Sequence, residues 1–256
     1  ARYNGRVASN DAVRIAAVGD LHCSRESSGT LRRLFEQAAA SADVLALCGD
    51  LTDYGRPEEA ELLAGELAAA GSRIPVVAVL GNHDHESGKA PELKDALTRA
   101  GIRVLDGDAC EILGVGFAGA KGYIGGFGRR SLQAWGEPSL KAIVHETAEE
   151  VIKLERALAR LRSSRRVVLL HYAPIVGTVE GEPPEIYPFL GSSHLEEPIN
   201  RYEVDVVFHG HAHHGKPEGR TSTGVAVYNC AMSLMRRTNA DQAPFRVVTL
   251  PAKVPA

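Results

Sequence analysis

The feature that most constrains the fold is a set of apolar runs that each stop abruptly at polar residues. They are VRIAAV before GDLH, DVLALC before GDLTD, PVVAVL before GNHDH, RRVVLL before HYAP, and VDVVF before HGHAHH. These runs are nearly continuous in Val, Leu, Ile and Ala, without the alternation of a strand that faces water on one side. They therefore predict strands that are covered on both faces, as in layered α/β folds.

Helical patterns separate these runs and support the same fold class. Pro and Gly punctuate several of them at the positions where helices begin and end. The predicted helices lie within residues 27–42, 57–71, 90–101 and 139–164. The alternation of strands and helices predicts an α/β domain, and no boundary divides it, so we expect a single domain over residues 1–256.

Three further stretches fit the alternation less simply. Residues 110–138 begin like a strand and continue as a Gly-rich loop, and residues 176–200 are a second loop, rich in Pro and Gly, that leads to a short helix. Residues 224–230 and 245–250 predict closing strands, which we expect to be antiparallel and to lie on a second sheet.

Composition excludes several classes of protein. The chain is 44% hydrophobic and 24% charged, which is typical of a soluble globular protein. Its net charge of −3, without a long basic run, argues against a nucleic-acid polymer or a membrane surface as partner. The N-terminal stretch lacks the apolar segment of a secretory signal, although a start at Ala1 leaves open whether a leader was removed. The four cysteines show no CxxC spacing, which favours reduced thiols in the cytoplasm.

The polar residues after the apolar runs are expected to meet, because ligand sites in open α/β sheets lie beyond the carboxyl ends of the strands. The side chains concerned are Asp20, His22, Asp50, Asp53, Asn82, His83, Asp84, His171, His211 and His213. Alternation along an extended chain would place each i, i+2 pair on one side. Carboxylate, amide and imidazole ligands together suit Mn, Fe, Zn or Co, and their number suits two ions that share a carboxylate.

The ordered motifs D-x-H, GDxxD, GNHD, a lone strand-end His and GHxH resemble those of the calcineurin-like metallophosphoesterase superfamily. They extend from Asp20 to His213, most of the chain. Protein Ser/Thr phosphatases of this superfamily carry GDxxDRG, whereas this chain reads GDLTDYG, with Tyr54 in place of that Arg. The resemblance is therefore closer to the bacterial phosphodiesterase-like branch, which includes cyclic nucleotide and glycerophosphodiester hydrolases.

This resemblance implies a fold and a metal centre. The fold would be an α/β/β/α sandwich of two mixed central sheets flanked by helices. The first metal would be held by Asp20, His22, Asp50 and His213, and the second by Asp50, Asn82, His171 and His211, with Asp50 bridging. His83 would be the catalytic histidine and Asp84 would orient it. Asp53 would not bind an ion itself but would orient a residue that does. The ions favoured are Mn and Fe.

The activity implied is hydrolysis of phosphate esters, most of all phosphodiesters, by a hydroxide held between the metals with His83 as general acid. The partner would be a small-molecule phosphate ester, and the sequence leaves a homodimer open. A phosphomonoesterase or a nucleotide pyrophosphohydrolase is the alternative within enzymes. The alternative that is not an enzyme is a non-catalytic interaction scaffold. The complete set of matched ligands argues against it.

Other polar residues are weaker candidates. Those that could contact the substrate are His85, Arg129, Arg130 and His194, although solvated loop positions explain the two arginines more simply. His209 and His214 are expected to form hydrogen bonds near the site rather than to bind metal. Cys23 and Cys48 are expected to pack in the core behind it.

Overall fold

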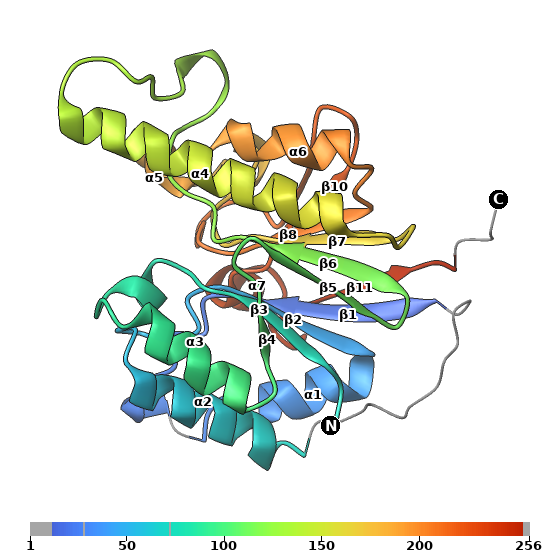
Figure 1. Cartoon of the computed structure of the whole chain (residues 1–256). Coiled ribbons are helices and arrows are strands. Elements are labelled where there is room, and N and C mark those ends of the chain that lie inside the picture. Colours follow the sequence, from blue (N-terminus) through green and yellow to red (C-terminus); the bar gives the residue numbers. More distant parts are fainter. Residues whose placement is uncertain (1–11, 28, 72, 253–256) are drawn as a thin grey trace.

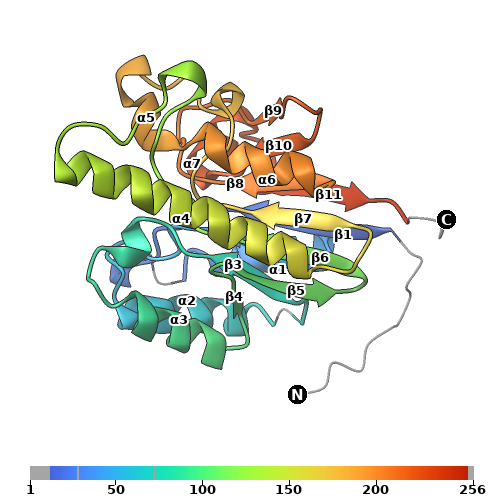
Figure 2. The same cartoon turned by 45° about the horizontal axis from the view of Figure 1, so that its top comes forward.

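Two β-sheets lie face to face in the computed structural model, which describes residues 12–27, 29–71 and 73–252 (Figures 1 and 2). Residues 1–11, on which the expectation about a leader rests, lie outside the described part. The first sheet has the order β11-β1-β2-β3-β4. Its strands are β1 Val13–Val18, β2 Val44–Cys48, β3 Val76–Val79, β4 Arg103–Val104 and β11 Arg246–Leu250. β1 to β4 are parallel, and β11 pairs with β1 in the antiparallel sense.

The second sheet has the order β5-β6-β7-β8-β10-β9. Its strands are β5 Asp108–Ile112, β6 Val115–Gly119, β7 Arg166–Leu169, β8 Val206–His209, β9 Glu218–Arg220 and β10 Ala226–Asn229. The four central strands are parallel and the two edge strands, β5 and β9, are antiparallel to their neighbours. Both sheets are thus mixed, as expected.

Helices cover the outer faces of both sheets. Figure 1 shows α1 to α3 below the first sheet and α4 to α6 above the second. The helices are α1 Arg32–Ser41, α2 Pro57–Ala69, α3 Ala90–Arg99, α4 Pro138–Arg160, α5 Tyr187–Leu190, α6 Glu196–Arg201 and α7 Met232–Thr238. Short 3₁₀ helices are η1 Arg25–Ser27, η2 His83–His85, η3 Gly128–Arg130, η4 Val176–Thr178, η5 Pro184–Ile186 and η6 Ser193–Leu195. The predicted α/β/β/α sandwich is confirmed, and within the described ranges every helix is too short or too polar to span a bilayer.

The burial of both faces of each sheet explains the unbroken apolar runs of the sequence. Ile15 and Ala17 of β1 pack between the sheets with Phe117 and Phe208. The residue between them, Ala16, belongs instead to the core under α1 to α3. A third cluster fills the space under α4 and α6. Because successive residues of a strand enter different cores, no polar face appears in its sequence.

The structure corrects the prediction for the two closing strands. β10 lies in the second sheet, as predicted, where it runs antiparallel to β9 but parallel to β8. β11 is antiparallel to its neighbour, as predicted, but it joins the first sheet, beside β1, instead of the second. The apolar pattern of a strand does not show which sheet it joins. The edge strand of either sheet can form hydrogen bonds with its backbone.

The stretch at residues 110–138 contains a hairpin where a single strand was predicted. β5 and β6 are joined by Leu113 and Gly114, whose φ values of 53° and 70° match a two-residue hairpin turn. Because β6 contains glycines, the sequence pattern did not show it as a strand. At Gly119 there is a structural reason for glycine. A Cβ on Gly119 would lie 2.7 Å from Val79 Cγ1, so glycine lets the two sheets approach closely there.

Candidate metal centre

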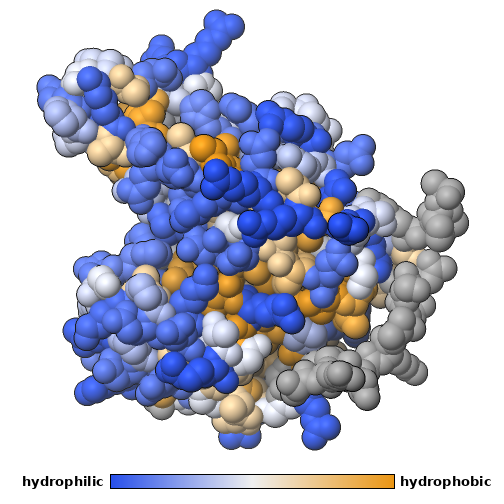
Figure 3. Space-filling model, in the orientation of Figure 1, coloured by the Kyte–Doolittle hydropathy of each residue, from blue (hydrophilic) through white to orange (hydrophobic). Residues whose placement is uncertain are grey.

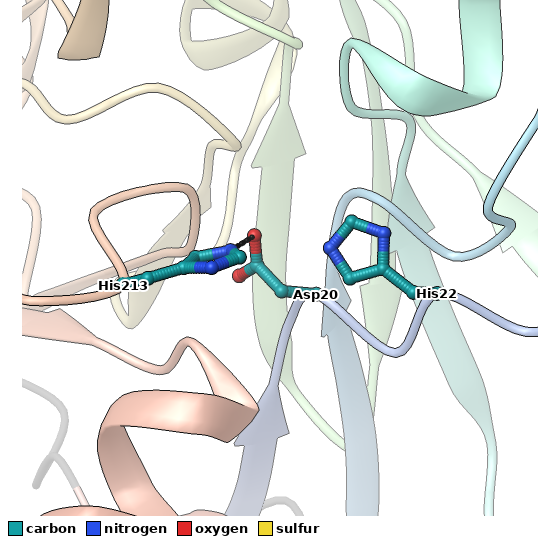
Figure 4. Close-up of side chains that lie close together, drawn as sticks. All are labelled: Asp20, His22 and His213. Carbon is teal, nitrogen blue, oxygen red and sulfur yellow. Dashed lines mark hydrogen bonds and ion pairs between the residues drawn. The ribbon is translucent and has the colours of Figure 1, made fainter.

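The strand-end residues meet at one end of the two sheets. Figure 4 shows the carboxylate of Asp20 between the rings of His213 and His22. The first sheet contributes its side chains after β1, β2 and β3, and the second after β7 and β8. Those side chains are Asp20, His22, Asp50, Asp53, Asn82 and His83 from the first sheet, and His171, His211 and His213 from the second.

The segments that carry the ligands bend sharply instead of continuing as strands. Asp20, His22, Asp50 and His211 have φ values of 57°, 45°, 47° and 70°. Such left-handed conformations are uncommon for residues other than glycine. The expected convergence of side chains therefore occurs, but the alternation of an extended chain is the wrong reason for it.

The first candidate ion position lies among Asp20, His22 and His213, whose ligand atoms are all within 4.8 Å of one another. His213 Nε2 is 2.9 Å from Asp20 Oδ1. His22 Nε2 is buried and has no hydrogen-bond partner among the described residues. A buried imidazole nitrogen without a partner is costly, and a cation at this point would satisfy it. The residues present therefore fit a metal ion.

A second candidate position lies among Asp50, His171 and His211, again with ligand atoms within 4.8 Å. His171 Nε2 is 2.8 Å from Asn82 Oδ1 and 3.4 Å from Asp50 Oδ1. Asp50 also forms a group with His22 and His83, and His22 Nε2 is 3.9 Å from Asp50 Oδ2. The Asp50 carboxylate thus lies between both positions, where a bridging ligand belongs.

In His171 and His211, a backbone carbonyl bonds to one ring nitrogen and leaves the other available for a metal ion. His171 Nδ1 lies 3.1 Å from Cys48 O, and His211 Nε2 lies 3.1 Å from Phe189 O. Only a protonated nitrogen can donate to a carbonyl, so His171 Nε2 and His211 Nδ1 remain free for metal. Burial lowers the pKa of His171 to about 4 and that of His211 to about 3. Both rings are therefore neutral near pH 7, the form that binds metal.

The surroundings shift the pKa values of the two central carboxylates in opposite directions. Burial, followed by the charge of Asp20, raises the pKa of Asp50 to about 6. Burial also acts to raise the pKa of Asp20, but its hydrogen bond to His213 and the neighbouring histidines lower it overall. The hydrogen bond to Asp20 in turn raises the pKa of His213. Such a site is suited to receive cations.

His83 is anchored by Asp53. Its Nδ1 donates to Asp53 O at 2.8 Å, and its amide donates to Asp50 Oδ1 at 2.9 Å. The Asp53 carboxylate lies 3.3 Å from His22 Nδ1, so this residue supports both rings. Burial acts to lower the pKa of His83, but the bond to Asp53 and the charges of Asp50, Asp53 and Glu86 raise it overall.

Asp84 does not orient the His83 ring, contrary to expectation. Its buried carboxylate accepts hydrogen bonds from the amides of Leu51, Thr52 and Gly81 and from the Thr52 hydroxyl, at 2.7–3.1 Å. His83 and Asp84 are neighbours in the turn η2, where their side chains diverge. Asp84 thus ties the loop after β2 to the loop after β3, and the carbonyl of Asp53 holds the ring.

The four weaker candidates have exposed side chains. His85 is exposed beside His83, and Arg129 and Arg130 are exposed in η3. His194 lies 3.2 Å from Glu197 and lines an apolar cavity of about 270 Å³ against α4. Among the described residues, none of these four side chains has a hydrogen bond, ion pair or ring contact with a candidate ligand.

Some supporting residues were not predicted. The buried Asn229 at the end of β10 donates to Ala212 O at 2.7 Å and accepts from Ala231 N at 3.1 Å. His209, as predicted, forms hydrogen bonds near the site, with its Nε2 2.8 Å from Thr178 Oγ1. Asn229 follows an apolar run, GVAVY, in the same way as the candidate ligands do. That signal could have identified it.

Comparisons with known proteins agree with this geometry. The model of the calcineurin-like phosphoesterase family matches residues 13–215. No significant match was found to a curated protein sequence.

Solved structures show the same fold. Phosphopantetheinyl hydrolase (PptH) from Mycobacterium tuberculosis is 15% identical, with a TM-score of 0.65 over 97% of this chain and 99% of its own. A second structure, the protein TT1561 of Thermus thermophilus, is 15% identical, with a TM-score of 0.54 over 94% and 100% of the two chains. Purple acid phosphatase PPD1 from yellow lupin seeds is 14% identical, with a TM-score of 0.51 over 80% of this chain and 38% of its own. At these identities the likeness concerns the fold alone.

Proposed function

Since the chain belongs to the calcineurin-like phosphoesterase family and is thereby a metallophosphoesterase, we propose that it hydrolyses phosphodiesters at a dinuclear metal centre. The observation that carries this proposal is the position of Asp50. Its carboxylate belongs to one group of ligand atoms with His22 and His83 and to another with His171 and His211. A carboxylate shared in this way is what two neighbouring ions require.

These groups support an assignment of residues to each ion. Asp20, His22, Asp50 and His213 would hold one ion, and Asp50, Asn82, His171 and His211 the other. Their oxygen and imidazole ligands favour Mn or Fe, and the four buried cysteines without a disulfide are in keeping with a reducing cytoplasm. When bound, the two ions would supply positive charge to the phosphoryl oxygens and lower the pKa of a water molecule.

His83 supplies the proton for the departing alcohol. Because its Nδ1 donates to Asp53 O, its Nε2 is the nitrogen that can donate to the leaving oxygen. The bonds from its Nδ1 to Asp53 O and from its amide to Asp50 Oδ1 fix the position of the ring beside the candidate ion positions. Asp53 also keeps His22 in the orientation that leaves its Nε2 free.

The two arginines of the Gly-rich loop give no support to a monoester. A monoester carries one more negative charge and calls for more cationic side chains, yet Arg129 and Arg130 have no contact with the candidate ligands within the described ranges. A monoesterase is the second candidate, favoured by Arg237, whose guanidinium donates to His213 O at 2.7 Å. A guanidinium is well suited to bind the extra charge of a monoester.

The test compares diester and monoester turnover on metal-defined protein. After chelation and repletion with Mn²⁺ or Fe²⁺, kcat/KM should be larger for bis(p-nitrophenyl) phosphate than for p-nitrophenyl phosphate. Asp50→Asn should lose both activities, whereas Asp43→Asn, an acidic residue bonded to Arg14 on the surface, should retain them. Absence of turnover with either ion would refute the proposal, and a preference for the monoester would favour the second candidate.

A further inference from the structure

Two residues whose backbone lies beside the candidate metal centre have large, exposed aromatic side chains. Tyr54 is 49% exposed and Phe189 is 58% exposed. Tyr54 directly follows Asp53, whose carbonyl accepts from His83 Nδ1. Phe189 itself provides the carbonyl that accepts from His211 Nε2. Phe189 thus fixes the His211 imidazole with its own carbonyl. Tyr54 is the chain neighbour of Asp53, which fixes the His83 imidazole.

We propose that Tyr54 and Phe189 bind the two organic arms of the phosphodiester, and that these arms are planar groups such as aryl or nucleoside moieties. This inference rests on the proposed function and adds a substrate class to it. A diester has two arms and a monoester one, so a ring at each side of the centre suits the diester.

The two rings come from opposite ends of the ligand set. At the Tyr54 end, the His83 and His22 rings are 4.6 Å apart between centroids. At the Phe189 end, the His171 and His211 rings are 4.8 Å apart. Tyr54 lies in the loop after β2 of the first sheet, and Phe189 lies in α5, on the side of the second sheet. Figure 3 shows a hollow at the left edge of the molecule, between the parts that these two sheets build.

The backbone around Tyr54 is fixed. The carboxylate of Glu59 accepts from the amides of Tyr54 and Arg56, at 3.0 and 3.2 Å. The Arg56 guanidinium lies 5.0 Å from the centre of the Tyr54 ring. Arg56 thus covers part of the ring while about half of the side chain stays open to solvent. A ring held before the substrate arrives loses little conformational entropy when it binds.

The backbone around Phe189 is fixed in a similar way. Pro188 O accepts from Gly125 N at 2.8 Å, and Leu190 O accepts from Ala173 N at 3.0 Å. With its own carbonyl bonded to His211, Phe189 lies in a short helix that is anchored at three successive residues. An exposed phenyl ring on an anchored segment presents a flat apolar surface on which a planar group can stack.

The position of the proton donor distinguishes the two arms. His83 delivers its proton to the leaving oxygen, and Tyr54 is next to the residue that holds His83. Tyr54 therefore contacts the leaving alcohol. Phe189, at the His211 end, contacts the alcohol that stays on the phosphate.

Two diesters separate these roles. Both release p-nitrophenol, but bis(p-nitrophenyl) phosphate retains an aryl arm and methyl p-nitrophenyl phosphate retains a methyl group. Phe189→Ala should lower the ratio of kcat/KM for the first to that for the second by roughly tenfold, which corresponds to about one stacked ring. Tyr54→Ala should lower kcat/KM for both by a similar factor and leave the ratio unchanged.

Matched variants control for unspecific effects. Trp135→Ala removes a ring that is 68% exposed in the loop before α4, and should change neither value. Tyr54→Phe and Phe189→Leu serve as milder variants, and metal content measured in every variant reports an intact centre. Unchanged kcat/KM in Tyr54→Ala, or an unchanged ratio in Phe189→Ala, overturns the inference. A wild-type protein without diester turnover would instead refute the proposed function.

Discussion

At the scale of single residues, the site places unusual demands on the backbone. Four candidate ligands have left-handed backbone conformations, which cost on the order of 1 kcal/mol or more for residues with a Cβ. Main-chain hydrogen bonds maintain them: Asp20 N donates to Gly49 O at 2.9 Å, and His22 N donates to Asp50 O at 3.0 Å. The loops after β1 and β2 thus hold each other in shape, so the ligands are positioned before any ion arrives.

The role of His83 as proton donor predicts a dependence on the leaving group. His83→Ala should retain both metal ions, because the ring is not among the residues assigned to either ion. It should lower kcat by about 10²–10⁴-fold for alkyl leaving groups, which need a proton to depart. A nitrophenyl leaving group needs none and should lose much less. Equal losses for the two substrate types, measured on metal-saturated protein, would contradict the assignment.

The side chains that meet in the candidate site could be predicted from the sequence, as could the contact of Asp53 with a ligand, whereas the backbone groups that fix the histidine rings could not. His171 and Asn82 each follow a recognisable apolar run, and the structure brings them to 2.8 Å of each other. The groups that fix the histidine rings are the carbonyls of Cys48, Asp53 and Phe189, and every residue has a carbonyl. Side-chain type therefore carries no signal for this support, and Asp84 was assigned a role that a carbonyl performs.

At the scale of elements, the segment between β10 and α7 supports the loop that carries His211 and His213. Asn229→Ala would remove one of the two donors to Ala212 O, which also accepts from Gly215 N, and would leave Ala231 N buried without its partner. We expect a loss of about 1–3 kcal/mol in the free energy of unfolding, measured by urea denaturation. The concentration of metal needed for half-maximal activity should rise as well.

Asn229→Asp provides the matched comparison. It keeps an oxygen for Ala231 N but loses the donor to Ala212 O, so its effects should be intermediate. Wild-type stability and metal requirement in Asn229→Ala would show that this asparagine does not hold the loop.

The helix α4 is joined to the loop before β5 by an ion pair that predicts a pH effect. Lys153 Nζ lies 3.0 Å from Asp106 and 2.7 Å from the buried Glu150. Burial acts to raise the pKa of Asp106, but the bond and charge of Lys153 lower it overall. Since the folded-state pKa lies below the unfolded one, this stabilisation is present at higher pH and is lost as the pH falls through the folded value.

Lys153→Met should therefore make Asp106 take up its proton at higher pH and move the midpoint of acid unfolding upward, as followed by circular dichroism. Lys141→Met is the matched control, because Lys141 lies on the same helix and has no ion pair in the described part of the chain. A midpoint that shifts equally in both variants, or in neither, would contradict this account.

The elements themselves were predictable to different degrees. The strands β1, β2, β3, β7 and β8 followed from apolar runs, and α2 to α4 from periodicity and punctuation. The partners of β10 and β11 did not, because pairing is decided by long-range backbone hydrogen bonds that leave no local pattern. β6 was not recognised as a strand because Gly116 and Gly119 have low strand propensity. Both glycines allow close packing instead.

At the scale of the whole molecule, the centre joins the two sheets. Chelation should lower the melting temperature, because ions that bind only the folded state stabilise it by about 4 kcal/mol each at a thousandfold excess over Kd. For a chain of this length the fall should be on the order of 10 °C, measured by calorimetry. Asp50→Asn should melt at the same temperature with and without chelator. Two separate transitions would contradict the single domain proposed for residues 1–256.

The distance along the chain between the two ends of the centre has a consequence for the order of synthesis. Asp20 and His213 make their contact across 193 residues, and β1 pairs with β11, near the other end of the described chain. A growing chain on the ribosome thus exposes Asp20 and His22 long before His213 has been made. The complete set of candidate ligands is consequently present only once His213 has been made, and a nascent chain that terminates before it would lack a complete centre.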